Sequence, residues 1–184
     1  MQTIDALLER RSAKALTAPA PDEDALDLIL ASAAAAPDHG RLRPWRFIVI
    51  QGNGLTRFGD LLAEHLRRTH PSTSAETLQR ERQKAFRAPM ILVVAVIATP
   101  GIKIPVIEQV LSAGAAAQNV MLAAHALGFN SMWKTGGPAY DEQVKTALGL
   151  EAKDAIVGFM YLGTEVSRPE ATPRPAWRDL VRHW

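Results

Sequence analysis

The feature that most constrains the fold is an uninterrupted apolar run near the middle of the chain. Residues 90–97 read Met-Ile-Leu-Val-Val-Ala-Val-Ile and follow Pro89 directly. A strand with one wet face alternates apolar and polar residues, whereas a strand buried on both faces is apolar throughout and rich in β-branched residues. The run therefore predicts a central strand buried on both faces, and 184 residues are enough to build a sizeable core around it.

Other apolar patterns predict the elements around this strand. Asp22 is expected to cap a helix over 23–35, and Gly128 is expected to end a long helix over 106–127. Further helices are expected at 3–10, 55–69, 74–86 and 140–148, and further strands at 47–50, 131–134 and 156–163. This order predicts an α+β fold of one domain, residues 1–184, with helices around a sheet of about four or five strands.

The C-terminal segment, residues 165–184, is polar but ends in an apolar and aromatic set. After three prolines it contains Trp177, Leu180, Val181 and Trp184. Clustered large apolar side chains are unfavourable in water, so this tail is expected to dock on its own core or on a partner subunit.

Composition and charge exclude several classes of protein. The chain is 47% hydrophobic and 22% charged, which is typical of a folded protein, and its formal net charge is only +2. The charges between Arg57 and Arg87 alternate in sign, which indicates a solvated helix surface and not a nucleic-acid-binding track. The chain has no cysteine, which excludes disulfides and thiolate metal sites, and its five histidines lack metal-binding spacing.

The sequence also shows no membrane or export signal. Residues 1–5 lack the basic and apolar regions of a signal peptide, and the apolar stretch 106–129 is interrupted by polar residues. No Gly-x-Gly-x-x-Gly follows a predicted strand, which argues against a Rossmann-type dinucleotide fold. A cytoplasmic protein with no nucleic-acid or membrane partner is therefore expected.

Three short segments concentrate polar and charged side chains. Residues 10–14 read Arg-Arg-Ser-Ala-Lys, residues 36–45 read Ala-Pro-Asp-His-Gly-Arg-Leu-Arg-Pro-Trp, and residues 131–136 read Ser-Met-Trp-Lys-Thr-Gly. The guanidinium and hydroxyl groups of the first segment suit an anionic ligand such as a phosphate. The alternative is that these cations only stabilise the C-terminal end of the first helix.

Together these segments resemble the FMN-dependent nitroreductase family, and the Asp-His pair at 38–39 is similar to its small bacterial YdjA-type branch. The family's Arg-x-Ser-x-Lys opening and its Ala-Pro…Pro-Trp segment occur here in the same order. The resemblance implies a nitroreductase-like fold with a central mixed β-sheet flanked by helices. It also implies a homodimer with FMN at the interface and a C-terminal tail that wraps the partner.

By this resemblance, the first segment binds the phosphate end and the pyrimidine edge of FMN. Arg10 and Ser12 are expected at the phosphate or nearby groups, and Lys14 near the N1 and O2 edge, where a cation stabilises reduced flavin. Arg11 is assigned to the same site, although neighbouring residues of a helix cannot all face one ligand. Arg174 matches a basic residue near the phosphate, with a solvated tail arginine as the alternative.

The second segment departs from the common family pattern. The resemblance implies that His39 contacts the FMN of the other subunit, and the alternative is a turn residue hydrogen-bonded to Asp38. Arg41 is also assigned to the cofactor site. However, Arg41 and Arg43 stand where the common family pattern has amide side chains, so the usual amide contacts to the flavin ring are not expected here and the two cations suit an anionic substrate.

The third segment is expected to lie along the flavin. Trp133, Lys134, Thr135 and Gly136 would flank the ring, and the backbone of Thr135 or Gly136 would supply an amide near N5. Glycine permits close approach of the backbone to a ligand. The alternative is an ordinary strand end with Trp133 in the core.

The implied activity is hydride transfer from NAD(P)H through FMN to a nitroaromatic, quinone or similar small-molecule acceptor. The flavin carries this chemistry, so the resemblance designates binding residues and no catalytic side chain. One alternative is a non-catalytic module that binds FMN for storage or redox sensing. Another is a basic α+β domain that binds nucleic acid, which would contain no flavin and bind with a steep salt dependence.

Overall fold

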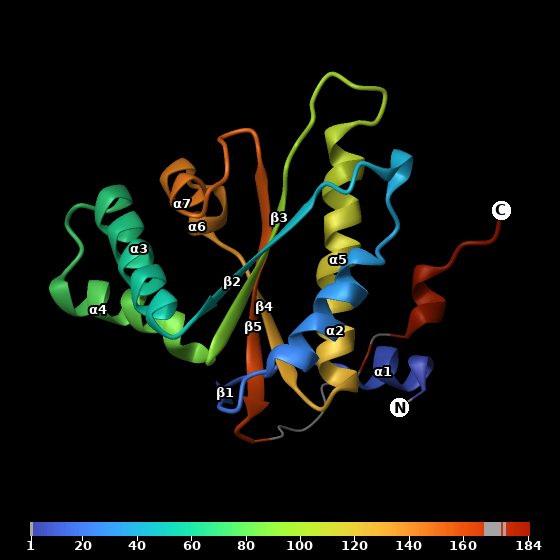
Figure 1. The fold of residues 1–184 in the computed structure, drawn as a ribbon, viewed down its shortest axis with the longest axis horizontal. Coiled ribbons are helices and arrows are strands. Elements are labelled where there is room, and N and C mark those ends of the chain that lie inside the picture. Colours follow the sequence, from blue (N-terminus) through green and yellow to red (C-terminus); the bar gives the residue numbers. More distant parts are fainter. Residues whose placement is uncertain (1, 168–173, 175) are drawn as a thin grey trace.

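A computed structural model describes residues 2–167, 174 and 176–184 of the chain. Figure 1 shows three layers, with a five-stranded sheet between two layers of helices. The strands are β1 (Leu16–Thr17), β2 (Trp45–Gln51), β3 (Met90–Val96), β4 (Asn130–Lys134) and β5 (Ala155–Glu165). β5 pairs with β1, β3 and β4, and β3 also pairs with β2.

The predicted central strand is confirmed. All of its residues, from Met90 to Val96, are buried, and its two edges pair with β2 and β5. Val93 lies opposite Ile48 on one side and Phe159 on the other. Successive side chains of a strand point to opposite faces. The side chains of β3 therefore alternate between the two core clusters, one on each face of the sheet.

One helical layer consists of α2 (Glu23–Ala34) and α5 (Val106–Ala126). Ala113, Ala117 and Ala124 of α5 are fully buried, and small side chains allow helices to approach closely. The Asp22 carboxylate accepts a hydrogen bond of 2.9 Å from the amide of Ala25, which confirms the predicted cap of α2. Gly128, with a φ of +88°, follows the last residues of α5 and ends the helix as predicted.

The other layer contains α3 (Asn53–Thr69), α4 (Ala75–Gln83), the 3₁₀ turn η2 (Lys84–Arg87), α6 (Gly137–Tyr140) and α7 (Glu142–Ala147). Phe58 of α3 packs on Phe159 of β5 with ring centroids 5.2 Å apart. Two short elements, α1 (Thr3–Glu9) and η3 (Trp177–Leu180), lie outside these layers, and Figure 1 shows both beyond the α2–α5 layer.

The α+β class is confirmed, with differences in detail. Every pairing between the five strands is antiparallel, and the expected mixed character is limited to an isolated parallel bridge between Ser12 and Ser131. The helix expected at 140–148 is confirmed as α7, which begins at Glu142 because the Asp141 carboxylate caps it through the amide of Val144. The short helix α6 before it was not expected, since Gly136-Gly137-Pro138 predicted only a turn. The two-residue strand β1 was not expected.

Candidate functional site

The 10–14 segment lies along β4. Ser12 forms its parallel bridge with Ser131, and the amide of Ala13 donates to the Ser131 carbonyl at 2.9 Å. Ser12 and Lys14 are exposed, whereas Ala13 is buried in the core. The parallel direction points Lys14 toward the same end of β4 as Lys134. The backbone thus anchors the segment and leaves the side chains of Ser12 and Lys14 available to a ligand.

Arg10 and Arg174 come together although they are far apart in the sequence. The Arg174 Nη2 donates to the carbonyl oxygen of Leu8 at 3.2 Å and to that of Arg10. The Nε of Arg10 is buried and has no hydrogen-bond partner among the described residues. Burial, and then the positive charge of Arg174, lower the pKa of Arg10 from its usual value. A buried, unpaired donor beside a second cation is an environment that an anion would stabilise.

Arg11 points to a different partner. Its guanidinium donates to both carboxylate oxygens of Glu165 in β5, at 2.8 and 2.5 Å. Both side chains are largely buried, with 20% of Arg11 and 8% of Glu165 exposed. This bidentate pair fastens the N-terminal segment to the sheet. Nη1 and Nη2 of Arg11, which would donate to FMN in the expected cofactor role, donate to Glu165 in this structure.

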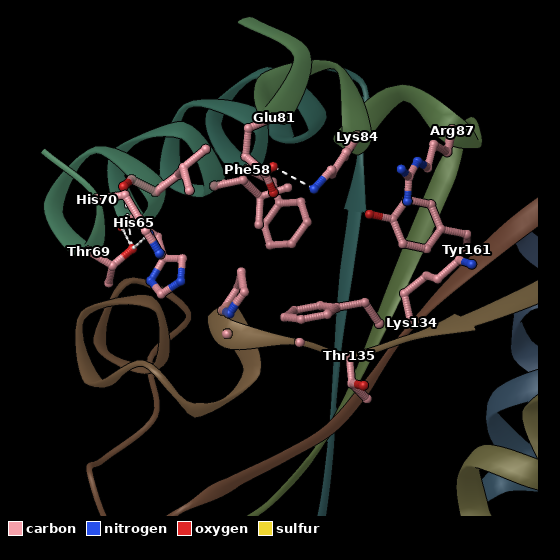
Figure 2. Close-up of a pocket in the computed structure, with 16 residues that line it drawn as sticks. Phe58, His65, Thr69, His70, Glu81, Lys84, Arg87, Lys134, Thr135 and Tyr161 are labelled. Atoms are coloured by element: carbon pink, nitrogen blue, oxygen red, sulfur yellow. Dashed lines mark hydrogen bonds and ion pairs between the residues drawn. The ribbon is translucent and has the colours of Figure 1, made fainter. Parts of the chain in front are cut away.

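A cavity of about 340 Å³ lies where β4 ends, between α3, η2, α6 and β5. Figure 2 shows side chains of these elements converging on it. Lys134, Thr135 and Gly136, which the sequence assigned to the flavin, form part of its wall. The remaining lining residues are Phe58, Leu62, His65, Leu66, Thr69, His70, Glu81, Lys84, Arg87, Gly137, Pro138, Phe159 and Tyr161.

The backbone at Gly136 requires glycine. Its φ of +113° and ψ of −171° belong to a region that residues with a Cβ atom rarely enter. Gly136 precedes α6 and its backbone is not covered by a side chain of its own. The chain therefore turns sharply at the cavity wall and presents the peptide groups of 135–137 there.

Sequence reasoning missed the cations on the opposite wall. Lys84 and Arg87 line the cavity, although the region 57–87 was interpreted as a solvated surface. Lys84 Nζ pairs with Glu81 at 2.5 Å. Tyr161 lies on the same wall, and burial raises the pKa of its hydroxyl group to about 12. The turn η2 directs Lys84 and Arg87 inward, and a charge pattern alone does not reveal that turn.

Trp133 faces the other side of the sheet from Lys134, as alternation along a strand requires. Its indole Nε1 donates to the carbonyl of Val157 at 3.1 Å, and its ring packs over Gly158 in the core layer of α5. The ring does not line the cavity. Within one chain Trp133 is therefore partly buried against this core layer, as in the alternative.

The 36–45 segment lies away from the cavity within one chain. His39 Nδ1 is 2.5 Å from Glu108 at the start of α5, so its partner is Glu108 and not Asp38. The Asp38 carboxylate instead accepts a hydrogen bond of 2.6 Å from the backbone amide of Arg43. Arg41 and Arg43 adopt φ values of +55° and +48°, which are uncommon for residues with a side chain. Neither His39 nor Arg41 lines the cavity.

Among the described residues, no group of three or more His, Cys, Asp or Glu side chains could hold a metal ion. No helix in that part of the chain is long and apolar enough to span a membrane.

Comparison with known proteins identifies the family. The model of the nitroreductase family matches residues 7–164. The chain is 36% identical to the "Putative NAD(P)H nitroreductase YdjA" of Escherichia coli (strain K12) over 180 aligned residues. The alignment covers 94% of this chain and 97% of that protein. The chain therefore belongs to the nitroreductase family, and the YdjA-type branch expected from the sequence is supported.

Solved structures confirm the nitroreductase-like fold. The nitroreductase-like family protein from Bacillus cereus is 26% identical, with a TM-score of 0.86 over 100% of this chain and 96% of that one. A "putative nitroreductase in complex with fmn" from Desulfovibrio desulfuricans is 25% identical, with a TM-score of 0.76 over 100% of this chain and 97% of that one.

Proposed function

We propose that this chain is an FMN-dependent NAD(P)H oxidoreductase that passes hydride from NAD(P)H through FMN to a nitroaromatic, quinone or similar acceptor. Membership of the nitroreductase family supports an oxidoreductase, and the relative from Desulfovibrio desulfuricans was crystallised with FMN. The observation that carries the proposal is the buried Nε of Arg10, which has no hydrogen-bond partner within the described part of the chain and lies beside Arg174, next to a strand that ends at a cavity.

The described residues fit FMN in two places. Arg10, Ser12 and Arg174 would hold the phosphate, because two guanidinium groups and a hydroxyl supply several charge-assisted hydrogen bonds. Lys14 would face the pyrimidine edge of the flavin, and the backbone at Thr135 and Gly136 would approach its ring. When bound, the flavin supplies the hydride chemistry, and the protein supplies binding, orientation and positive charge.

We also propose that the active form is a homodimer with FMN at the interface. Apolar side chains are exposed on several elements at the α2–α5 side of the molecule. They include Ile4 and Leu8 of α1, Leu28 of α2, Leu111 of α5, and Trp177, Leu180 and Trp184 of the tail. A surface of this kind is typical of a protein interface. In such a dimer, His39 and Arg41 of one subunit would reach the FMN of the other.

Anaerobic mixing of the FMN-loaded protein with NADH or NADPH tests the proposed activity. We expect the flavin absorbance to bleach and then to recover when menadione, a quinone, is added. A protein that binds FMN but is not reduced by either nucleotide would refute the enzymatic proposal and favour the non-catalytic module. Sedimentation of the same sample tests the dimer, and a monomer at assay concentration would refute it.

A further inference from the structure

His65 is a nearly buried histidine on the wall of the cavity. It belongs to α3, and 13% of its side chain is exposed. Figure 2 shows it on the side of the cavity that lies across from Arg87 and Tyr161. A Cβ atom on Gly137 would come within 2.7 Å of its Nε2, so this nitrogen lies beside the 135–137 backbone.

A carboxylate holds the other nitrogen of the same ring. Nδ1 of His65 is buried and lies 3.2 Å from Oδ2 of Asp141, an ion-pair distance rather than a well-aligned hydrogen bond. Arg68 Nη2 donates to both oxygens of Asp141 at 2.8 Å, and the amide of Val144 donates to Oδ1 at 3.0 Å. The carboxylate is therefore fixed from two sides, and 11% of it is exposed.

This arrangement makes the two nitrogens of the His65 ring chemically different. A carboxylate beside Nδ1 favours the proton on that atom, which leaves Nε2 as the exchangeable position. An oriented imidazole at a cavity wall is the usual arrangement of a general acid or base. Nothing in the FMN contacts proposed above uses His65, Asp141 or Arg68.

We propose that His65 is the proton donor to the acceptor during its reduction and that Asp141 is its positioning residue. The inference rests on the proposed function, because reduced FMN is the hydride source. With a quinone, the hydride goes to the acceptor and the proton leaves Nε2 of the imidazolium, which gives hydroquinone and neutral imidazole. Solvent then reprotonates Nε2 before the next turnover.

The titratable and charged groups around His65 come from several elements. Asp141 and Arg68 contact it or its partner on the protein side. On the cavity side the groups are His70, which follows α3, Glu81 of α4, Lys84 and Arg87 of η2, Lys134 of β4 and Tyr161 of β5. Glu81 is paired with Lys84, so Asp141 is the carboxylate that lies directly beside the imidazole.

The two half-reactions of the FMN-loaded enzyme separate this role from others. The protein is reduced anaerobically with NAD(P)H and then mixed with menadione, which needs protons, or with ferricyanide, which accepts only electrons. Rates are measured across the range in which histidine titrates, about pH 5 to 8. The variants are His65→Gln, Asp141→Asn and, as the matched control, His70→Gln, which changes an exposed histidine of the same cavity.

We expect His65→Gln to slow the menadione step by about tenfold or more at low pH and to flatten its pH profile. Asp141→Asn should move the midpoint of the profile to lower pH. His70→Gln should behave like the wild type, and all variants should react with ferricyanide at the wild-type rate. NMR titration of the His65 ring in the loaded protein should give the same midpoint and the same shift in Asp141→Asn.

Three results would overturn the inference. A wild-type menadione profile in His65→Gln would show that the imidazole donates no proton. An equal slowing with menadione and ferricyanide would show that the substitution perturbs the flavin. A wild-type NMR midpoint in Asp141→Asn would remove Asp141 from the role. The reductive step separates the two proposals. If NAD(P)H does not reduce the flavin of the wild type, the proposed function itself is refuted. If the flavin is reduced and one of the three results above is found, only the role of His65 and Asp141 is refuted.

Discussion

Arg10 and Arg11 are adjacent in the sequence, yet their replacement by alanine should have opposite effects. Arg10 lies beside Arg174 with a buried Nε that no described residue accepts from, whereas Arg11 forms a bidentate pair with Glu165. Arg10→Ala should therefore impair FMN binding and spare the fold. Arg11→Ala should weaken the fold and affect FMN binding much less.

The magnitudes follow from these contacts. A hydrogen bond to a charged group contributes about 1.5–3 kcal/mol, so Arg10→Ala should raise the Kd for FMN about tenfold to hundredfold. The same change removes a cation next to Arg174 and an unpaired donor, so the FMN-free protein should keep its stability. Breaking a buried ion pair costs about 3–5 kcal/mol. Because 20% of Arg11 is exposed, we expect about 2–3 kcal/mol for Arg11→Ala.

Both quantities are measured on the same samples. FMN fluorescence titration of the flavin-free protein gives Kd, and urea denaturation without FMN gives the free energy of unfolding. Unchanged FMN affinity in Arg10→Ala would remove Arg10 from the site. A variant Arg11→Ala that unfolds like the wild type but binds FMN as poorly as Arg10→Ala would place Arg11 in the FMN site and refute its structural role.

Three further predictions concern stability and ionisation. Gly158→Ala should destabilise the protein by about 2 kcal/mol in urea, because its Cβ would lie 2.2 Å from Nε1 of Trp133; wild-type unfolding would contradict this packing. Burial opposes the ionisation of Asp141, but hydrogen bonds led by Arg68 lower its pKa from 3.8 to about 2. About 2 kcal/mol of stability should therefore be present above pH 4 and lost as the pH falls through 2, and Asp141→Asn should abolish this component. Spectrophotometric titration should show one tyrosine, Tyr161, ionising near pH 12, and its replacement by Phe should remove that component.

Much of the fold could be predicted because its signals are local. The apolar run at 90–97 and the small residues of 106–127 leave few alternatives to a buried strand and a buried helix. The direction in which the strands pair could not be predicted, because an antiparallel sheet and a mixed sheet can contain the same strands. β1 consists of only two residues and is defined by its partner β5, so its own sequence carries no pattern.

The site could be predicted only in part, for similar reasons. The family motifs identified the 10–14 and 131–136 segments, and the structure brings Arg174 to Arg10. The sequence could not reveal that Arg11 turns to Glu165, because that carboxylate lies at the end of the last strand. His65 was also missed, since a histidine on a charged helix gives no signal until Asp141 is placed beside it.

The FMN content of the purified protein tests the central claim most directly. We predict a flavin absorption spectrum, with FMN quantified after denaturation at a ratio approaching one molecule per chain. Protein purified without flavin should regain that ratio when it is incubated with FMN and freed of excess. A colourless protein that takes up no added FMN would contradict the proposed cofactor and the activity that depends on it.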